Sequence, residues 1–223
     1  MNKIPVYFMP GLAASPKIFE NINLPEEYEC HYLSWILPKD KNETVKAYAT
    51  RLAQSVKHDD PVLIGVSFGG VIVQEMAGIV NARRVIIISS VRCNTEFPKR
   101  MQFAKKTHAY RFFPTGILNK MHVLRKLTMN NSVMAKRLDL YEKFIHLRDK
   151  KYLDWAFKTI INWDRCEPDP QVVQVHGDAD EVFPPKYLDN FIPVRGGTHI
   201  MIINKAKWLN KHLPDIIKNG SLG

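Results

Sequence analysis

The stretch Pro61-Val62-Leu63-Ile64-Gly65-Val66-Ser67-Phe68-Gly69-Gly70 decides the fold. Its apolar run predicts a buried strand that stops at Ser67, and apolar residues at helical spacing follow at once. We therefore expect a strand, a sharp turn with Ser67 at its apex, and a helix. Gly65 and Gly69, two residues to either side, would remove the side chains that collide where the strand and the helix close together. An apical residue lies at the carboxyl end of its strand, where α/β sheets carry their active sites, and beside the free N–H groups that begin a helix.

Gly-x-Ser-x-Gly is a weak signal when it stands alone, because any buried strand can end in a turn rich in glycine and serine. The strand before Ser67 and the helix after it favour the alternative, a nucleophile elbow that holds the serine hydroxyl exposed. The sequence therefore predicts that Ser67 is a nucleophile.

Short apolar runs alternate with helical patterns on either side of this stretch. Such alternation is typical of an α/β fold with a doubly wound, mostly parallel sheet whose strands are buried on both faces. We expect about six strands, at residues 4–9, 28–35, 62–66, 84–90, 171–175 and 191–194. Helices are expected at residues 45–56, 68–80, 184–190 and 200–218.

The pattern changes in the second half of the chain, where no strand is convincing between Phe97 and Trp163. Helical periodicity dominates there, which predicts helices at 99–110 and 114–128, a third capped by Asn131 and a fourth capped by Asp149. We interpret residues 92–166 as a helical lid inserted into a core formed by residues 1–91 and 167–223. The methionines of this insert fit an ordinary core or a soft surface for an apolar ligand, and the clearest are Met101, Met121, Met129 and Met134.

The net charge of +10 is concentrated in the same insert. Of the 32 Lys and Arg residues, 17 lie between Arg92 and Arg165, together with only 6 of the 22 Asp and Glu residues, so the rest of the chain is close to neutral. A basic segment can attract anionic substrates, nucleic acid or a membrane surface. The basic residues alternate with acidic and apolar ones at helical spacing, which favours the simpler explanation that they solvate the outer faces of amphipathic helices.

The composition excludes several other classes of protein. Cys30, Cys93 and Cys166 lack paired spacing, so we expect no disulfide framework, no metal site and a reducing compartment. No apolar run approaches the roughly 20 residues that span a bilayer. The chain enters a strand directly at Ile4, without the apolar segment of a signal peptide. These features predict a cytoplasmic protein with no membrane span. We also expect no nucleic-acid partner, because solvated helix faces explain the basic residues, and no cofactor.

A serine hydroxyl is a poor nucleophile at neutral pH and needs a base, usually histidine, whose cation an acidic partner stabilises. His199 and the pair Asp178 and Asp180 follow the last two predicted strands, and loops at the same ends of adjacent parallel strands can converge. We favour Asp180 as the acid because it lies deeper in its loop, whereas Asp178 would support the turn. His176, at the end of its strand, is expected to be buried and hydrogen-bonded.

Attack on a carbonyl creates an oxyanion, which needs fixed hydrogen-bond donors. The backbone N–H of Phe68, directly after the serine, is one candidate, and the N–H of Leu12, after Pro10 and Gly11, is the other. The alternative for Pro10 and Gly11 is a turn without such a role.

Together these motifs resemble the α/β-hydrolase fold superfamily, in particular its small lidded esterase-like members. The resemblance rests on Gly65-Val66-Ser67-Phe68-Gly69-Gly70, His176-Gly177-Asp178-Ala179-Asp180 and Gly196-Gly197-Thr198-His199, in the family's order of nucleophile, acid and histidine. It implies a Ser67–Asp180–His199 triad, oxyanion donors at Leu12 and Phe68, and a lid. The chain departs from the family at Met9-Pro10-Gly11, where many members have His-Gly, and its opening hairpin looks absent.

The function expected from the triad is hydrolysis of a carboxylic ester or thioester through an acyl-enzyme intermediate, with no metal or organic cofactor. The partner would be a small acyl substrate, with an anionic one suggested by the basic lid. Two alternatives stay open: a lyase or cofactor-free haloperoxidase-like enzyme of the same fold, or a non-catalytic binding protein acting through the basic insert. The sequence carries no information on the oligomeric state.

Overall fold

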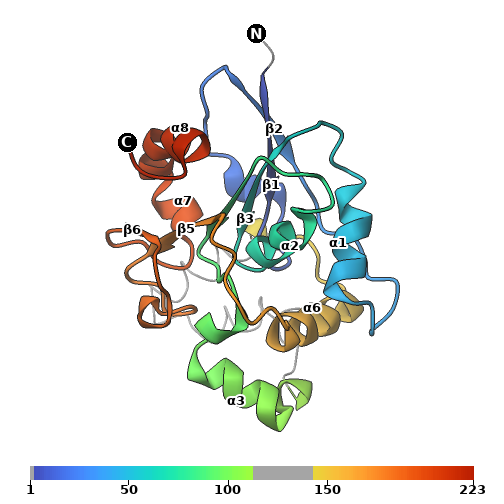
Figure 1. Ribbon diagram of the computed structural model, residues 1–223. Coiled ribbons are helices and arrows are strands. Elements are labelled where there is room, and N and C mark those ends of the chain that lie inside the picture. The colour runs from blue at the N-terminus through green and yellow to red at the C-terminus, as the bar shows by residue number, and fades with distance from the viewer. Residues whose placement is uncertain (1–2, 113–142) are drawn as a thin grey trace.

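The computed structural model describes residues 3–112 and 143–223, and its centre is a six-stranded sheet in the order β2-β1-β3-β4-β5-β6 (Figure 1). All neighbouring strands are parallel, which confirms the sheet predicted from the sequence. The strands are β1 (Ile4–Met9), β2 (Tyr28–Tyr32), β3 (Val62–Val66), β4 (Arg84–Ile88), β5 (Val172–Gly177) and β6 (Ile192–Val194).

The hydrophobic core forms two layers, one on each face of the sheet. Successive strand residues point to opposite faces, so Val6 and Phe8 join one apolar cluster while Tyr7 and Met9 join the other. The Tyr7 face is covered by α1 (Val45–Ala53), α2 (Phe68–Met76) and α6 (Lys150–Asn162). The opposite face is covered by the 3₁₀ turn η1 (Pro16–Phe19), α7 (Met201–Asn204) and α8 (Ala206–Asn219). Burial on both faces explains why these strands are continuous apolar runs in the sequence.

The order of the strands creates a switch point between β1 and β3. From β1 the chain moves outward to β2, then returns to the other side of β1 to form β3. In open parallel sheets, the crevice at such a reversal, beyond the carboxyl ends of the strands, is where ligands bind. The loop after β1 and the turn at Ser67 flank this crevice.

Two helix starts follow from capping residues. The Thr44 hydroxyl accepts a hydrogen bond from the Ala47 N–H at 3.1 Å, and α1 begins with the next residue. The Asp149 carboxylate accepts one from the Tyr152 N–H at 2.9 Å at the start of α6, which confirms the predicted cap.

The expected C-terminal helix is broken. Lys205 has φ −120° and ψ 22°, outside helical values, and separates α7 from α8. Buried residues recur at helical spacing on both sides of Lys205, so the apolar pattern could not reveal the break. The helix expected at 184–190 is likewise shorter, a single 3₁₀ turn η5 (Pro185–Tyr187).

The predicted insert is described only at its two ends. The first end contains η2 (Asn94–Glu96), α3 (Lys99–Thr107) and the 3₁₀ turn η3 (Ala109–Phe112), and the second contains α6. Figure 1 shows α3 and α6 together beyond one end of the sheet. The helix expected at 114–128, the Asn131 cap and the methionines Met121, Met129 and Met134 lie outside the described residues.

Across residues 3–112 and 143–223, every helix is too short or too polar to cross a bilayer.

Candidate active site

Ser67 occupies a strained backbone conformation between β3 and α2. Its φ of 52° and ψ of −121° lie in a region that residues with a side chain rarely adopt. Such strain costs about 1–3 kcal/mol and persists only where the surrounding structure holds it. The predicted sharp turn is therefore present, with Ser67 as its apex.

Three hydrogen bonds hold this turn against its strain. The Ser67 N–H donates to the Ile88 carbonyl at 2.9 Å, and the Ser67 carbonyl accepts from the Gly70 N–H at 2.8 Å. The same carbonyl accepts from the Ser90 hydroxyl at 2.7 Å. Ser90 follows the neighbouring strand β4, and nothing in the pattern around Ser67 pointed to it.

The glycines around Ser67 are required by close backbone contacts. A Cβ at Gly65 would lie 2.4 Å from the Gly69 carbonyl oxygen, so strand and helix could not close together. A Cβ at Gly69 would instead lie 2.4 Å from the carbonyl oxygen of Pro10, at the end of β1. Gly65 therefore acts as expected, whereas Gly69 makes room for the neighbouring loop.

The side chains of Ser67, His199 and Asp180 form a continuous chain of contacts. His199 Nε2 lies 3.0 Å from the Ser67 hydroxyl oxygen, and His199 Nδ1 lies 2.9 Å from Asp180 Oδ2. The side chain of His199 is 21% exposed and that of Asp180 is 0% exposed. This series of contacts therefore leads from a buried carboxylate to an accessible imidazole and hydroxyl, which is the arrangement a base needs to activate a serine.

Asp180 is held in one orientation by its own loop. Its Oδ1 accepts hydrogen bonds from the N–H groups of Val182 at 2.8 Å and Phe183 at 3.0 Å. Burial alone would raise the pKa of Asp180. Three interactions oppose it and hold that pKa below its usual value: the hydrogen bond with His199, the positive charge of His199, and the hydrogen bond from the Phe183 N–H. The carboxylate is therefore ionised at neutral pH. The Phe183 ring packs edge-on to the His199 imidazole, with ring centroids 5.5 Å apart.

Asp178, the competing aspartate, does not contact His199. It is exposed, and its Oδ1 accepts a hydrogen bond from the Gly196 N–H at 2.6 Å. This bond ties the loop after β5 to the turn that carries His199. The expected turn-supporting role of Asp178 is thus present, although its partner lies in the next loop.

His176 lies behind the carboxylate of Asp180 and is fully buried, as expected. Its Nε2 donates to the Phe183 carbonyl at 2.8 Å and lies 3.3 Å from Asp180 Oδ2. Burial lowers the pKa of His176, and the nearby Asp180 charge only partly opposes this. A neutral His176 thus packs against the carboxylate without adding a charge.

The loop after β1 lies directly against Ser67. A Cβ at Gly11 would be 3.6 Å from Ser67 Cβ, so the backbone of this loop borders the serine. Among residues 3–112 and 143–223, the N–H groups of Leu12 and Phe68 have no hydrogen-bond acceptor. Two free donors therefore stand on the elements that flank the hydroxyl.

Two aromatic side chains fix the loop that carries Leu12. The Trp35 indole N–H donates to the Gly11 carbonyl at 2.8 Å, and the Ala13 N–H donates to the Tyr152 hydroxyl at 3.2 Å. Leu12 therefore lies between two anchored neighbours. Trp35 follows β2 and Tyr152 lies in α6, so sequence reasoning, which had no signal linking either to Leu12, missed both.

The described C-terminal end of the predicted insert also pairs with this loop. The Ser15 N–H donates to the Phe144 carbonyl at 2.8 Å, and the His146 N–H donates to the Ala13 carbonyl at 2.9 Å. Residues 144–146 therefore add a short backbone support to the loop beside Ser67.

No protein-family model matches the sequence, and no curated protein matches it either. Among solved structures, it is similar to a carboxylesterase from Nitrososphaera gargenis, with a TM-score of 0.69 and 14% identity, over 98% of this chain and 92% of that one. It is similar to an enol-lactonase from Burkholderia xenovorans LB400, with a TM-score of 0.66 and 14% identity, over 98% and 93% of the two chains. It is also similar to a bromoperoxidase from Bacillus anthracis, with a TM-score of 0.66 and 16% identity, over 98% and 93%.

Proposed function

We propose that this chain, which has the α/β-hydrolase fold, is a serine hydrolase that cleaves a carboxylic ester or thioester. The observation that carries the proposal is the contact chain from the Ser67 hydroxyl through His199 to Asp180, with steps of 3.0 and 2.9 Å. Its position beside the switch point of the sheet, where ligands bind in such folds, supports the same conclusion.

In this mechanism His199 Nε2 takes the hydroxyl proton as the Ser67 oxygen attacks the carbonyl carbon. Asp180 keeps the proton of His199 on Nδ1 and stabilises the imidazolium that forms. The oxyanion is held by the N–H groups of Leu12 and Phe68. His199 then protonates the leaving alcohol or thiol, which leaves an acyl group on Ser67. A water molecule, deprotonated by His199, then attacks the acyl carbon. The bond to the Ser67 oxygen breaks, His199 returns the proton to that oxygen, and the acid is released.

The substrate is proposed to be a small acyl compound, with residues 92–166 forming a lid over it. The solved structures named above include a carboxylesterase and an enol-lactonase, and both names describe cleavage of an ester bond. The surplus of Lys and Arg between Arg92 and Arg165 supports an anionic substrate. A carboxylated ester should then be cleaved with a lower KM than its neutral analogue, and the difference should shrink as salt is added.

The nucleophile is tested by covalent labelling with a fluorophosphonate probe. The wild-type chain should be labelled and Ser67→Ala should not, because the probe reacts only with an activated hydroxyl. Ser221→Ala is the matched control, since Ser221 is exposed near the C-terminus, and it should be labelled like the wild type. Equal labelling of Ser67→Ala and the wild type would exclude Ser67 as the nucleophile.

A second candidate is haloperoxidase-like chemistry without a cofactor at the same three residues. It is favoured by the similarity to a structure named as a bromoperoxidase. A screen of short acyl esters against a bromination assay with peroxide and bromide separates the two. Ester turnover that Ser67→Ala abolishes supports the hydrolase, and bromination without ester turnover supports the second candidate.

A further inference from the structure

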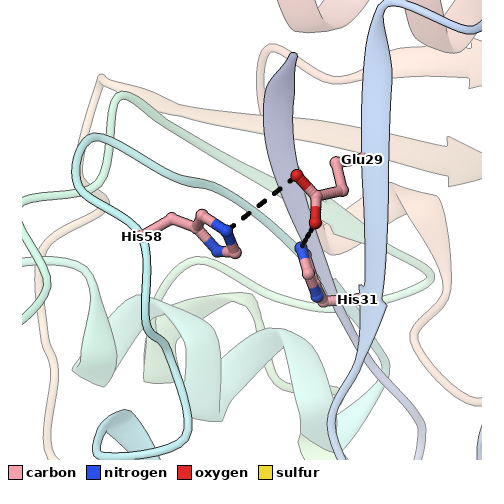
Figure 2. A group of neighbouring side chains, drawn as sticks. All are labelled: Glu29, His31 and His58. Atoms are coloured by element: carbon pink, nitrogen blue, oxygen red, sulfur yellow. Dashed lines mark ion pairs between the residues drawn. The ribbon is translucent and has the colours of Figure 1, made fainter. Parts of the chain in front are cut away.

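A second cluster of reactive side chains lies away from Ser67, at the β2 edge of the sheet. Figure 2 shows the Glu29 carboxylate between the imidazoles of His31 and His58, with both rings turned toward it. Within the described ranges 3–112 and 143–223, these are the only three His, Cys, Asp or Glu residues whose ligand atoms all lie within 4.8 Å of one another. None of them contributes to the chain of contacts at Ser67.

The backbone places this cluster without special geometry. Glu29 and His31 are two residues apart on β2, so their side chains point to the same face of the strand. His58 comes from the loop between α1 and β3, which brings it to the same edge from a distant part of the sequence. β2 is the last strand of the sheet on this side, and in the cluster Glu29 and His58 are exposed while His31 is half-buried.

The distances are those of a site for a small divalent cation. His31 Nε2 lies 3.2 Å from Glu29 Oε1, and His58 Nε2 lies 3.9 Å from Glu29 Oε2. Ligands bound tetrahedrally to Zn²⁺ at about 2.0–2.2 Å are separated by about 3.3–3.5 Å. The Glu29–His31 separation already matches this value, the Glu29–His58 separation is about half an ångström longer, and all three ligand atoms lie within 4.8 Å of one another.

Among the residues that the structure describes, one buried ring nitrogen of the cluster has no hydrogen-bond partner. His31 Nε2 is shielded from solvent, and although it lies close to Glu29 its geometry there is not that of a hydrogen bond. A buried polar atom without a partner costs free energy. A metal ion bound to Nε2 would satisfy it.

The Tyr7 hydroxyl contacts the ring nitrogen of His58 that faces away from Glu29. Its oxygen lies 2.7 Å from His58 Nδ1 and accepts a hydrogen bond from the Lys57 N–H at 2.9 Å. A metal ion on His58 Nε2 requires the ring proton on Nδ1, and the second lone pair of the Tyr7 oxygen would then accept that proton. Metal-binding histidines generally donate their second N–H to a fixed acceptor of this kind. The buried Tyr7 ring also stacks on the His31 ring, with centroids 4.6 Å apart.

There is room beside the cluster for the rest of a coordination shell. A cavity of about 400 Å³ is lined by Tyr7, His31 and His58 together with neighbouring residues of β2 and the following loop.

We propose that Glu29, His31 and His58 form a binding site for a divalent transition-metal ion of the zinc type, with Tyr7 as the acceptor behind His58. Imidazole nitrogens with one carboxylate are a ligand set that suits Zn²⁺ and its neighbours, whereas Ca²⁺ and Mg²⁺ prefer oxygen ligands alone. The site is independent of the hydrolase proposal, because it shares no residue with it.

The test is a calorimetric titration of the full chain, stripped of metal with EDTA, with zinc chloride alone. We expect one saturable site per chain. His31→Gln and His58→Gln should each bind Zn²⁺ at least about tenfold more weakly, and Tyr7→Phe, which keeps all three ligands, about 10- to 100-fold more weakly. His212→Gln in α8 is the matched control and should bind like the wild type.

Unchanged affinity in both His31→Gln and His58→Gln would overturn the proposal, as would the absence of saturable binding to the wild type. A measurement without variants covers the case in which a substitution unfolds the protein. Wild-type crystals soaked in zinc chloride should show an anomalous peak within bonding distance of His31 and His58, and a peak only at other residues would equally overturn the site.

Discussion

Replacing Asp180 by asparagine tests the role of the carboxylate with almost no change of shape. The direction in which the new amide would point follows from the structure. Oδ1 accepts the N–H groups of Val182 and Phe183, so the amide oxygen of the introduced asparagine should take that position. The amide NH₂ then replaces Oδ2 and faces His199 Nδ1.

An NH₂ group at that position reverses the tautomer of the base. It donates to His199 Nδ1, so the proton of the neutral ring moves to Nε2, the atom that must accept the Ser67 proton. The wrong tautomer in this arrangement lowers kcat by about 10⁴-fold, or roughly 5.5 kcal/mol of transition-state stabilisation. The effect should lie in kcat, because the Asp180 side chain is fully buried and contacts Ser67 only through His199.

The assay is hydrolysis of a short-chain p-nitrophenyl ester at pH 7.5, with circular dichroism to confirm that the variant is folded. Asp178→Asn is the matched control. An amide oxygen can still accept the Gly196 N–H that Asp178 Oδ1 accepts at 2.6 Å, so this variant should stay within a few-fold of the wild type. The reasoning is refuted if Asp180→Asn retains more than a tenth of wild-type kcat, or if Asp178→Asn is the variant that loses activity.

Three further predictions concern the surroundings of the site. Trp35→Phe removes the indole N–H that anchors the Gly11 carbonyl. In the same ester assay kcat should fall about tenfold with little change in KM, because a hydrogen bond of this kind is worth about 1.4 kcal/mol. An unchanged kcat would contradict this prediction. His176→Gln should reduce the decrease in the free energy of unfolding that occurs at acid pH. Burial depresses the pKa of His176 in the folded state, so the stability that His176 contributes is present above its unfolded-state pKa of about 6.5 and is lost as the pH falls below that value. The free energy of unfolding in urea should therefore differ less between pH 7.5 and pH 5.0 for the variant than for the wild type. Arg92→Met leaves the buried Glu96 carboxylate without the guanidinium that it contacts at 3.0 Å. The free energy of unfolding, measured by urea unfolding, should fall by about 3 kcal/mol. A loss under about 1 kcal/mol would count against this account.

The residues that could be located from the sequence are those whose roles are set by their immediate neighbours. Buried parallel strands appear as short apolar runs, and the bounds of Ile4–Met9 were predicted to the residue. The glycines around Ser67 indicate a sharp turn because only a residue without Cβ fits where two backbones meet. The convergence predicted for Ser67, Asp180 and His199 agrees with the distances in the structure, since parallel strands bring their carboxyl ends to one edge.

Where the sequence offers two neighbouring candidates for one role, only the path of the loops in the folded chain decides between them. Asp178 and Asp180 are chemically identical and two residues apart, and only the fold shows which one reaches His199. The apolar pattern continues unchanged across the break at Lys205, because burial is compatible with one helix or with two.

The supporting contacts depended on tertiary structure throughout. Trp35 and Tyr152 anchor the two sides of Leu12 from positions 24 and 139 residues away from their bonding partners. Glu29 and His58 meet although they belong to separate elements. Short-range periodicity records which face of an element is buried, and it holds no information about which distant side chain completes a hydrogen bond or a ligand set. That pairing is decided when the elements pack, and so it can be found only in the folded chain.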